Sequence, residues 1–408
     1  MQEQLNLFAA SYEKPELPKK IRLIEFFAGI GAQAKALEIL GADFENWRTC
    51  EWSWQSILAY NAIHHDGEKC DTSRFTYEEV LNKLDGISHD YNQPMTKENL
   101  RRRGEEWARN VLGAMLKNNN LCPNISSLTA QDLRIEDRGN YTYILTYSFP
   151  CQDLSNAGLG KGMEKGSGTR SGLLWEVERI LLECKELDCL PQVLVMENVP
   201  GVISKANLNP FNQWLDALEG MGYTNYHKIL NAKDYGIPQN RQRCFMVSIL
   251  GEYSYHFPKK MKLKYRLKDF IKQKVDESYY LSDELVKSFE EHTQRQKAKG
   301  EHSSPNSSDT FKKVSSVREP SRVVIVNDVP SPSVGENEKP FPLEVNQSEE
   351  AELHIPSATS KGYMEAHEGD GVLPTWKGAR GTVQGGATPT ILTSPETIGV
   401  VVKDDRKG

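Results

Sequence analysis

Short apolar runs alternate with longer helical patterns between Ile21 and Leu250, and this alternation limits the possible folds more than any other feature. The apolar runs are IRLIEFF, TYILTYSF, QVLVMENV and RCFMVSIL, and the helical patterns between them are AQAKALEIL, LLWEVERILLEC and FNQWLDALEGMG. Strands separated by amphipathic helices predict an α/β fold with a doubly wound, mostly parallel sheet. Such sheets bind ligands beyond the carboxyl ends of their strands, so we expect the functional residues there.

The rest of the chain departs from this alternation. Residues 1–20 are polar and contain two prolines, which is typical of an N-terminal tail. Residues 66–124 form a polar, helix-prone insertion in the domain that spans residues 21–250. Beyond it, residues 251–408 are rich in Ser, Pro and Gly and end in short strand-like runs, which predicts a second, smaller and irregular β-rich domain.

Charge and hydropathy exclude two classes of protein. The chain has 50 Lys and Arg against 56 Asp and Glu, a net charge of −6, so it does not bind nucleic acid by overall charge. A local patch is available in the strongly basic segment 259–274. No run approaches the ~18 apolar residues of a membrane span, and the N-terminus does not resemble a secretory signal. We therefore expect a cytoplasmic protein.

The seven cysteines give no sign of a metal site. They are scattered without any C-x-x-C pair, and only Cys184 and Cys189 lie close together in the sequence. Neither a zinc ribbon nor a disulfide framework has this spacing. We predict no metal.

The first candidate site is the turn Phe26–Gly31, which lies between a strand and a helix. Glycines there allow a sharp bend and close approach of a ligand to the helix N-terminus. About 20 residues further on, Glu51 could accept hydrogen bonds from ribose hydroxyls, and Trp52 could cover an adenine ring. An adenosine-containing cofactor is the leading interpretation. An ordinary tight turn and a core tryptophan are the alternatives.

The second candidate is Cys151, which ends the segment Ser148–Cys151 after a strand. Pro150 precedes it and a glycine-rich loop follows, so the cysteine is placed to act as a nucleophile beneath a closing loop. The alternative is a small buried hydrophobic residue. The loop is not a phosphate-binding P-loop, because Ser155 stands where that motif has its first glycine.

Two further candidates involve charged side chains at strand ends. Glu197 ends an apolar strand, where a carboxyl group suits proton sharing with a ring nitrogen. Arg241 and Arg243 precede the next strand, and strand alternation would place both on one face as a clamp for an anion or a base carbonyl. An ordinary strand-end glutamate and a solvated strand edge are the alternatives.

Taken together and in order, these motifs resemble the cytosine-specific DNA methyltransferases that methylate ring carbon 5. The matching segments are FFAGIG at 26–31, EW at 51–52, QDL at 131–133, SFPCQ at 148–152, ENV at 197–199 and QNRQR at 239–243. Each motif alone is common, but six in the family's order are specific. The resemblance implies a Rossmann-like fold that binds S-adenosylmethionine, and double-stranded DNA as the substrate.

The resemblance also implies a role for each candidate residue. Cys151 would add to carbon 6 of a flipped-out cytosine, Glu197 would contact N3 and the exocyclic amine, and Arg241 and Arg243 would hold the base carbonyl and nearby loop atoms. The implied cofactor contacts are Phe27, Gly29, Ile30 and Gly31 around the methionine part, Glu51 at the ribose, Trp52 and Leu133 as adenine walls, Asp132 at the adenine amine, and Pro150 beside the cofactor.

The chain also departs from the family pattern. We find neither of the last two family motifs after residue 251, which predicts that a second subunit supplies them or that the chain is inactive alone. Methylation of cytosine in RNA and a non-catalytic DNA-binding role are the alternatives. The expected setting is restriction-modification or phage-type DNA modification, by a cytoplasmic protein that is prokaryotic or phage-encoded.

Overall fold

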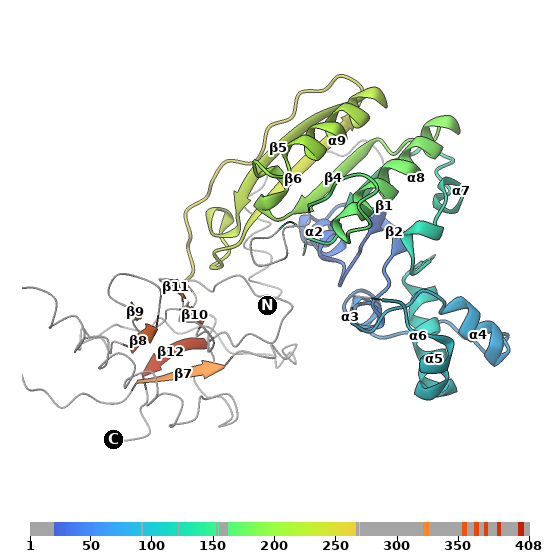
Figure 1. Ribbon diagram of the computed structural model, residues 1–408, viewed down its shortest axis with the longest axis horizontal. Helices are drawn as coiled ribbons and strands as arrows, with labels where there is room; N and C mark the ends of the chain where they lie inside the picture. Colours follow the sequence, from blue (N-terminus) through green and yellow to red (C-terminus); the bar gives the residue numbers. More distant parts are fainter. Residues whose placement is uncertain are drawn as a thin grey trace, which may run out of the picture. The chain divides into compact units, whose positions relative to one another are not determined.

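The chain divides into two compact units, which are Met1–Leu230 with Gln242–Pro258 and Asn231–Arg241 with Lys259–Gly408. The computed structural model (Figure 1) describes residues 20–90, 93–120, 122–151, 154, 162–266 and 269, and beyond them the backbone of six short strands. The tail predicted for residues 1–20 lies outside the described residues except for Lys20, and so do Gln152 and residues 155–161 of the glycine-rich loop.

The elements between residues 20 and 266 follow the alternation in the sequence. The strands are β1 (Lys20–Phe26), β2 (Phe44–Cys50), β3 (Tyr141–Tyr147), β4 (Val193–Asn198), β5 (Tyr223–Asn231) and β6 (Gln242–Leu250). The α-helices are α2 (Ala32–Leu40), α3 (Trp54–His65), α4 (Tyr77–Lys83), α5 (Lys97–Arg103), α6 (Glu105–Lys117), α7 (Ala130–Leu133), α8 (Leu174–Glu186) and α9 (Leu208–Gly220). Four 3-10 helices are η1 (Ile125–Ser127), η2 (Ser171–Leu173), η3 (Pro200–Ile203) and η4 (Ala232–Tyr235).

The six strands form one mixed sheet in the order β2-β1-β3-β4-β6-β5. The pairs β1–β2, β1–β3 and β3–β4 are parallel, and β4–β6 is antiparallel. The predicted α/β fold with a mostly parallel sheet is confirmed. The strand order reverses between β1 and β3, so the crevice that such sheets use for ligands lies at the carboxyl ends of these two strands.

Helices cover both faces of this sheet. On one face, Ile24 and Phe26 of β1 belong to the main hydrophobic core, which also holds Val177 of α8 and Trp214 of α9. On the other face, the hydroxyl of Tyr60 on α3 donates a 2.8 Å hydrogen bond to the buried carboxyl of Glu25. Alternate residues of β1 thus face different layers, as strand geometry requires.

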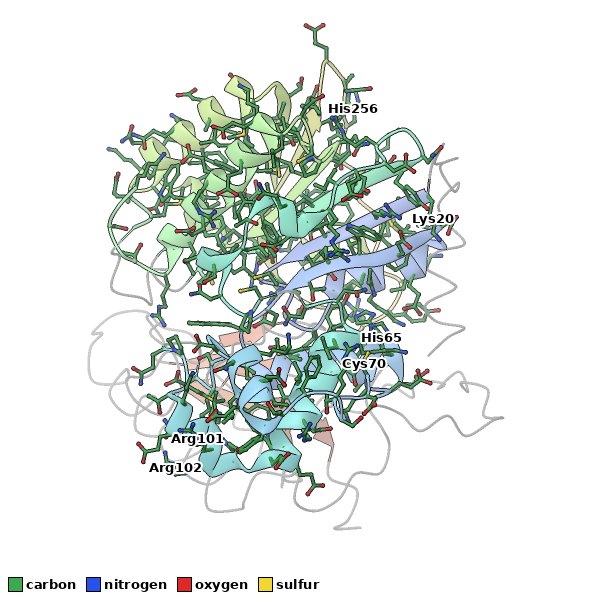
Figure 2. The ribbon with its side chains drawn as sticks, turned by 90° about the vertical axis from the view of Figure 1, so that its right-hand side faces the viewer. Lys20, His65, Cys70, Arg101, Arg102 and His256 are labelled. Carbon is green, nitrogen blue, oxygen red and sulfur yellow. The ribbon has the colours of Figure 1, made fainter. Side chains whose placement is uncertain are left out.

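The insertion predicted at residues 66–124 contains a small helical layer with its own core. Helices α4, α5 and α6 gather beside α3 (Figure 1), and the side chains of Arg101 and Arg102 project from α5 in Figure 2. A second core cluster joins Ile57 of α3 to apolar residues of the insertion such as Leu100 and Leu112. Gly104, with φ 90°, separates α5 from α6. The helix-prone character predicted for residues 66–124 is confirmed by the three α-helices α4, α5 and α6.

The second unit contains short strands, described by their backbone alone. They are β7 (Ser321–Ile325), β8 (Leu353–Pro356), β9 (Tyr363–Ala366), β10 (Gly371–Leu373), β11 (Thr382–Gln384) and β12 (Gly399–Lys403). Four form a sheet in the order β11-β10-β12-β7, and β8 pairs with β9. All of these pairs are antiparallel. This agrees with the irregular β-rich module expected from the sequence.

The edge strands β2 and β5 correspond to none of the predicted strand segments. Most residues of each strand are partly or fully exposed. Polar side chains can occupy both faces of such an edge, so its sequence lacks the apolar run that marks the central strands. Within the described residues, no helix is long and apolar enough to cross a membrane.

Candidate active site

The turn between β1 and α2 is held open by unusual backbone angles. Phe27, Gly29 and Gly31 have φ values of 56°, 55° and 78°, in the left-handed region that favours glycine. A Cβ on Gly31 would lie 2.3 Å from Nε2 of His64 and 2.5 Å from Cε2 of Tyr60, whereas one on Gly29 would meet nothing within 4 Å. The turn therefore packs tightly against α3 at Gly31 and is open at Gly29.

Glu51 joins the end of β2 to this turn. Its Oε2 accepts a 2.8 Å hydrogen bond from the backbone N–H of Gly29, and its Oε1 accepts a 2.7 Å bond from the N–H of Ser53. Burial raises the pKa of the Glu51 carboxyl, and the backbone hydrogen bonds act in the opposite direction. Glu51 thus fixes the turn, and the ribose contact expected from the sequence stays a prediction. The adjacent Trp52 is half-buried.

Asp132 and Leu133 lie in the short helix α7. Oδ2 of Asp132 accepts hydrogen bonds from the N–H and hydroxyl of Thr129, at 2.9 and 2.7 Å, and so caps this helix. The Leu133 side chain is fully buried in the main core. Asp132 is exposed. Neither predicted cofactor contact is tested by this geometry.

Cys151 follows β3 in a segment that is held by β4 and by the 3-10 helix η2. The carbonyl of Phe149 accepts a 3.0 Å hydrogen bond from Nδ2 of Asn198 on β4. The carbonyl of Pro150 accepts a 2.7 Å bond from the hydroxyl of Ser171. Cys151 itself is half-buried. The position after a central parallel strand, next to the reversal of strand order, agrees with the place expected for a reactive residue.

Glu197 on β4 lies against two side chains from neighbouring strands. Its Oε2 accepts a 2.7 Å hydrogen bond from the hydroxyl of Ser148, and its Oε1 lies 3.0 Å from Nε of Arg243. The side chains of Glu197 and Arg243 are 19% and 15% exposed, so this ion pair is only partly screened by water. The structure thus brings together Glu197 and Arg243, two of the predicted site residues.

Arg241 is held differently from Arg243. Strand β6 begins at Gln242, so the alternation used to predict a shared face does not extend to Arg241. Its backbone N–H donates to Oδ1 of Asn231 at 3.1 Å, and its carbonyl accepts from the N–H of Ala232 at 3.0 Å. These contacts place Arg241 in the loop between β5 and β6.

Comparison with known proteins shows the family. The family model for C-5 cytosine-specific DNA methylases matches residues 105–366, which is more than half of the chain. The chain belongs to this family. The methylase is 39% identical over 274 residues to the orphan methyltransferase M.SssI of Spiroplasma monobiae, a match that covers 65% of this chain and 69% of the relative. It is 36% identical over 269 residues to the type II methyltransferase M2.ScrFI of Lactococcus lactis subsp. cremoris, covering 65% and 71%.

Among solved structures, the Dnmt2 methyltransferase of S. pombe aligns with 67% of each chain at 19% identity and a TM-score of 0.41. The family resemblance inferred from the six motifs is confirmed by the family model and the relatives. The methylase is a DNA cytosine methyltransferase, and S-adenosylmethionine is its cofactor. Among the described residues of the methylase, no group of three or more His, Cys, Asp or Glu side chains could hold a metal ion.

The turn of the methylase fits S-adenosylmethionine. The open space beside Gly29 leaves backbone accessible to a ligand, and the neighbouring Ile30 is 52% exposed. Phe27, Trp52 and Pro150 are half-buried and so retain accessible surface. Exposed apolar groups beside a strand-to-helix turn suit the adenine ring and the methylene groups that flank the cationic sulfonium of this ligand.

Sequence reasoning assigned no role to Ser148 or Asn198, although both were within quoted motifs. The parallel register of β3 and β4 pairs Tyr147 with Met196, so the next step along both strands brings Ser148 beside Glu197. These two residues are 49 positions apart in the chain. No local pattern encodes that register, and only the paired strands reveal it.

Proposed function

We propose that the methylase transfers a methyl group to carbon 5 of cytosine in duplex DNA through a covalent bond to Cys151. The arrangement of Glu197 carries this proposal, because its carboxylate lies between Ser148 and Arg243 on the strand next to the Cys151 segment. A nucleophile and an acid–base group on adjacent strand ends form the pair that addition to a pyrimidine ring requires.

The chain's own residues supply most of the chemistry. The Cys151 thiolate forms a bond to ring carbon 6 as N3 takes up a proton from water, which turns the ring into an enamine with a nucleophilic carbon 5. The Glu197 carboxylate accepts a hydrogen bond from the N3–H and so stabilises the protonated ring. Arg243 and Arg241 hold the base carbonyl and nearby loop atoms. S-Adenosylmethionine, when bound, supplies an electrophilic methyl group. Loss of the carbon 5 proton to a base returns the electron pair to the ring and releases the thiolate, and N3 then gives its proton back to water.

Trapping tests this assignment. In duplex DNA that carries 5-fluorocytosine, the fluorine on carbon 5 cannot leave as a proton does, so the enzyme stays attached. We expect the full chain with S-adenosylmethionine to form an adduct stable to denaturation and Cys151→Ser to form none. Cys70→Ser is the matched control, because Cys70 is an exposed cysteine in the insertion (labelled in Figure 2). An adduct formed by Cys151→Ser contradicts the assignment.

A methylation assay tests the RNA alternative. Faster methylation of transfer RNA than of duplex DNA would favour RNA as the substrate. Trapping by the purified chain alone tests the predicted second subunit. An adduct formed without any other protein contradicts that prediction. A type II setting in a prokaryotic cytoplasm stays a prediction, motivated by the names of the relatives. Sequencing the methylated cytosines of an expressing host would identify the recognised sequence.

The predicted domain roles extend this proposal. We propose that residues 21–250 carry the chemistry and residues 251–408 recognise the target. The exposed side chains Lys259, Lys262, Lys264 and Arg266 would contact DNA phosphates, whereas Lys260 lies 2.7 Å from Asp234. Loss of one phosphate contact reduces the slope of log affinity against log salt by ~1. We expect this for Lys262→Ala, and no change for Lys117→Ala, whose ammonium pairs with Glu68 in the insertion.

A further inference from the structure

Ser148 occupies a position from which it can control Glu197. The serine is the first residue after β3, and its hydroxyl lies 2.7 Å from Oε2 of Glu197. The hydroxyl of Ser148 donates this hydrogen bond and the carboxylate oxygen accepts it. Ser148 therefore contributes a charge-assisted hydrogen bond, which is stronger than one between neutral groups.

Arg243 holds the other side of the same carboxylate. Its Nε lies 3.0 Å from Oε1, so the two donors address different oxygens. A carboxylate held by one donor can rotate about its terminal torsion, which is broad and roughly two-fold. A second donor on the other oxygen restricts that rotation. Ser148 and Arg243 together fix the plane of the Glu197 carboxylate.

The same short segment carries the cysteine. Ser148 lies three residues before Cys151, and the carbonyl of the intervening Phe149 accepts a 3.0 Å hydrogen bond from Nδ2 of Asn198. Two hydrogen bonds therefore tie adjacent residues of the Cys151 segment to adjacent residues of β4. Because small displacements of reacting groups reduce rates strongly, this pairing bears directly on the reaction.

We propose that Ser148 is a positioning residue that orients the Glu197 carboxylate toward the target cytosine. This inference rests on the role of Glu197 in the proposed function. Ser148 acts through Glu197, so its removal slows addition of Cys151 to the base and leaves binding of DNA and cofactor intact.

Single-turnover trapping with 5-fluorocytosine duplex DNA and S-adenosylmethionine tests the proposal in the full chain. Loss of one hydrogen bond to a charged group predicts that Ser148→Ala slows adduct formation ~10- to 100-fold. Ser148→Thr keeps a hydroxyl and restores most of the rate. Ser248→Ala is the matched control, because the hydroxyl of Ser248 on β6 is buried without a hydrogen-bond partner in the described structure. Its rate stays at the wild-type level.

A double-variant cycle distinguishes positioning from general loss of structure. If Ser148 acts through Glu197, then adding Ser148→Ala to Glu197→Gln slows trapping much less than it slows the wild type. Equilibrium affinities for unmodified duplex DNA and for S-adenosylmethionine stay unchanged in Ser148→Ala.

Three results would overturn the inference. The first is a wild-type rate of trapping for Ser148→Ala, and the second is failure of Ser148→Thr to restore the rate. The third is that Ser148→Ala slows trapping by the same factor in Glu197→Gln as in the wild type. The proposed function fails separately, by the absence of any adduct with the wild-type chain or by an adduct with Cys151→Ser. The same set of reactions therefore tells the two failures apart.

Discussion

Two glutamates lie at strand ends of the same sheet and are held by different kinds of partner. Glu51 follows β2 and is buried, and both of its oxygens accept hydrogen bonds from backbone N–H groups of Gly29 and Ser53. Glu197 lies in β4 and is half-buried, and its oxygens contact the side chains of Ser148 and Arg243. Backbone donors are fixed by the fold, whereas side chains can turn when a ligand enters.

This difference in partners predicts a structural role for Glu51 and a role in the reaction for Glu197. A buried carboxylate satisfied by backbone donors stabilises the turn that contains them. A carboxylate held by side chains near the surface can exchange part of its contacts for those of a bound base. We therefore expect substitutions at Glu51 to act mainly on stability, and substitutions at Glu197 to act mainly on the reaction rate.

The largest expected effect is on stability at Glu51. Glu51→Ala leaves two backbone N–H groups without their acceptor, which lowers the free energy of unfolding by about 2–6 kcal/mol. Glu197→Ala lowers it by less, about 1–2 kcal/mol, because the side chains of Ser148 and Arg243 can turn toward other partners when the carboxylate is lost. Urea unfolding of both variants measures the difference. Equal losses at the two positions would show that the comparison is wrong.

Two glycines of the turn test how tightly it packs on α3. Gly31→Ala forces a Cβ into Tyr60 and His64 at a positive φ, and should lower the free energy of unfolding by about 2–5 kcal/mol and weaken cofactor binding. Gly29→Ala has a similar φ but open space, so only the backbone cost of about 1–2 kcal/mol applies. Urea unfolding and cofactor titration compare the pair. A larger loss at Gly29 contradicts the described packing.

A third glutamate, Glu25 on β1, extends the comparison to pH. Burial raises the pKa of Glu25 from its ordinary 4.5 to about 7, although hydrogen bonds from Tyr60 and the Ala34 backbone oppose this. Between these values the folded state binds more protons than the unfolded state, so stability falls by roughly 3 kcal/mol as pH rises through this window.

Glu25→Gln cannot ionise and should lose most of this pH dependence. Urea unfolding between pH 5 and pH 8 measures the slope. Glu38→Gln, an exposed position on α2 paired with Lys35, is the control and should keep the wild-type slope. An unchanged slope in Glu25→Gln would mean that Glu25 is not the group responsible.

The smallest expected effect concerns the geometry of the Glu197 ion pair. Arg243→Lys keeps the positive charge but replaces the planar guanidinium by an ammonium, so we expect trapping to slow by roughly 10-fold. The free energy of unfolding should change by less than about 1 kcal/mol. If stability falls while the trapping rate is unchanged, Arg243 belongs with Glu51 in supporting the fold.

Sequence patterns were most informative where local chemistry decides structure. The apolar runs and helical periodicities predicted the central strands and the helices α2, α8 and α9, because burial of one face imposes a period on the residues that form it. The six motifs in order were enough to indicate the family. The edge strands β2 and β5 were not predicted, because a partly exposed strand lacks the apolar run that marks the central strands.

The contacts within the candidate site were decided by tertiary structure. The pairing of Ser148 with Glu197 follows from the parallel register of β3 and β4, and the burial of Leu133 follows from how α7 packs into the main core. Glu51 binds a turn that is 22 positions away in the chain. Local sequence determines which residues can form a strand end or a turn, whereas register and packing determine which of them meet, because those contacts depend on segments that are distant in the chain.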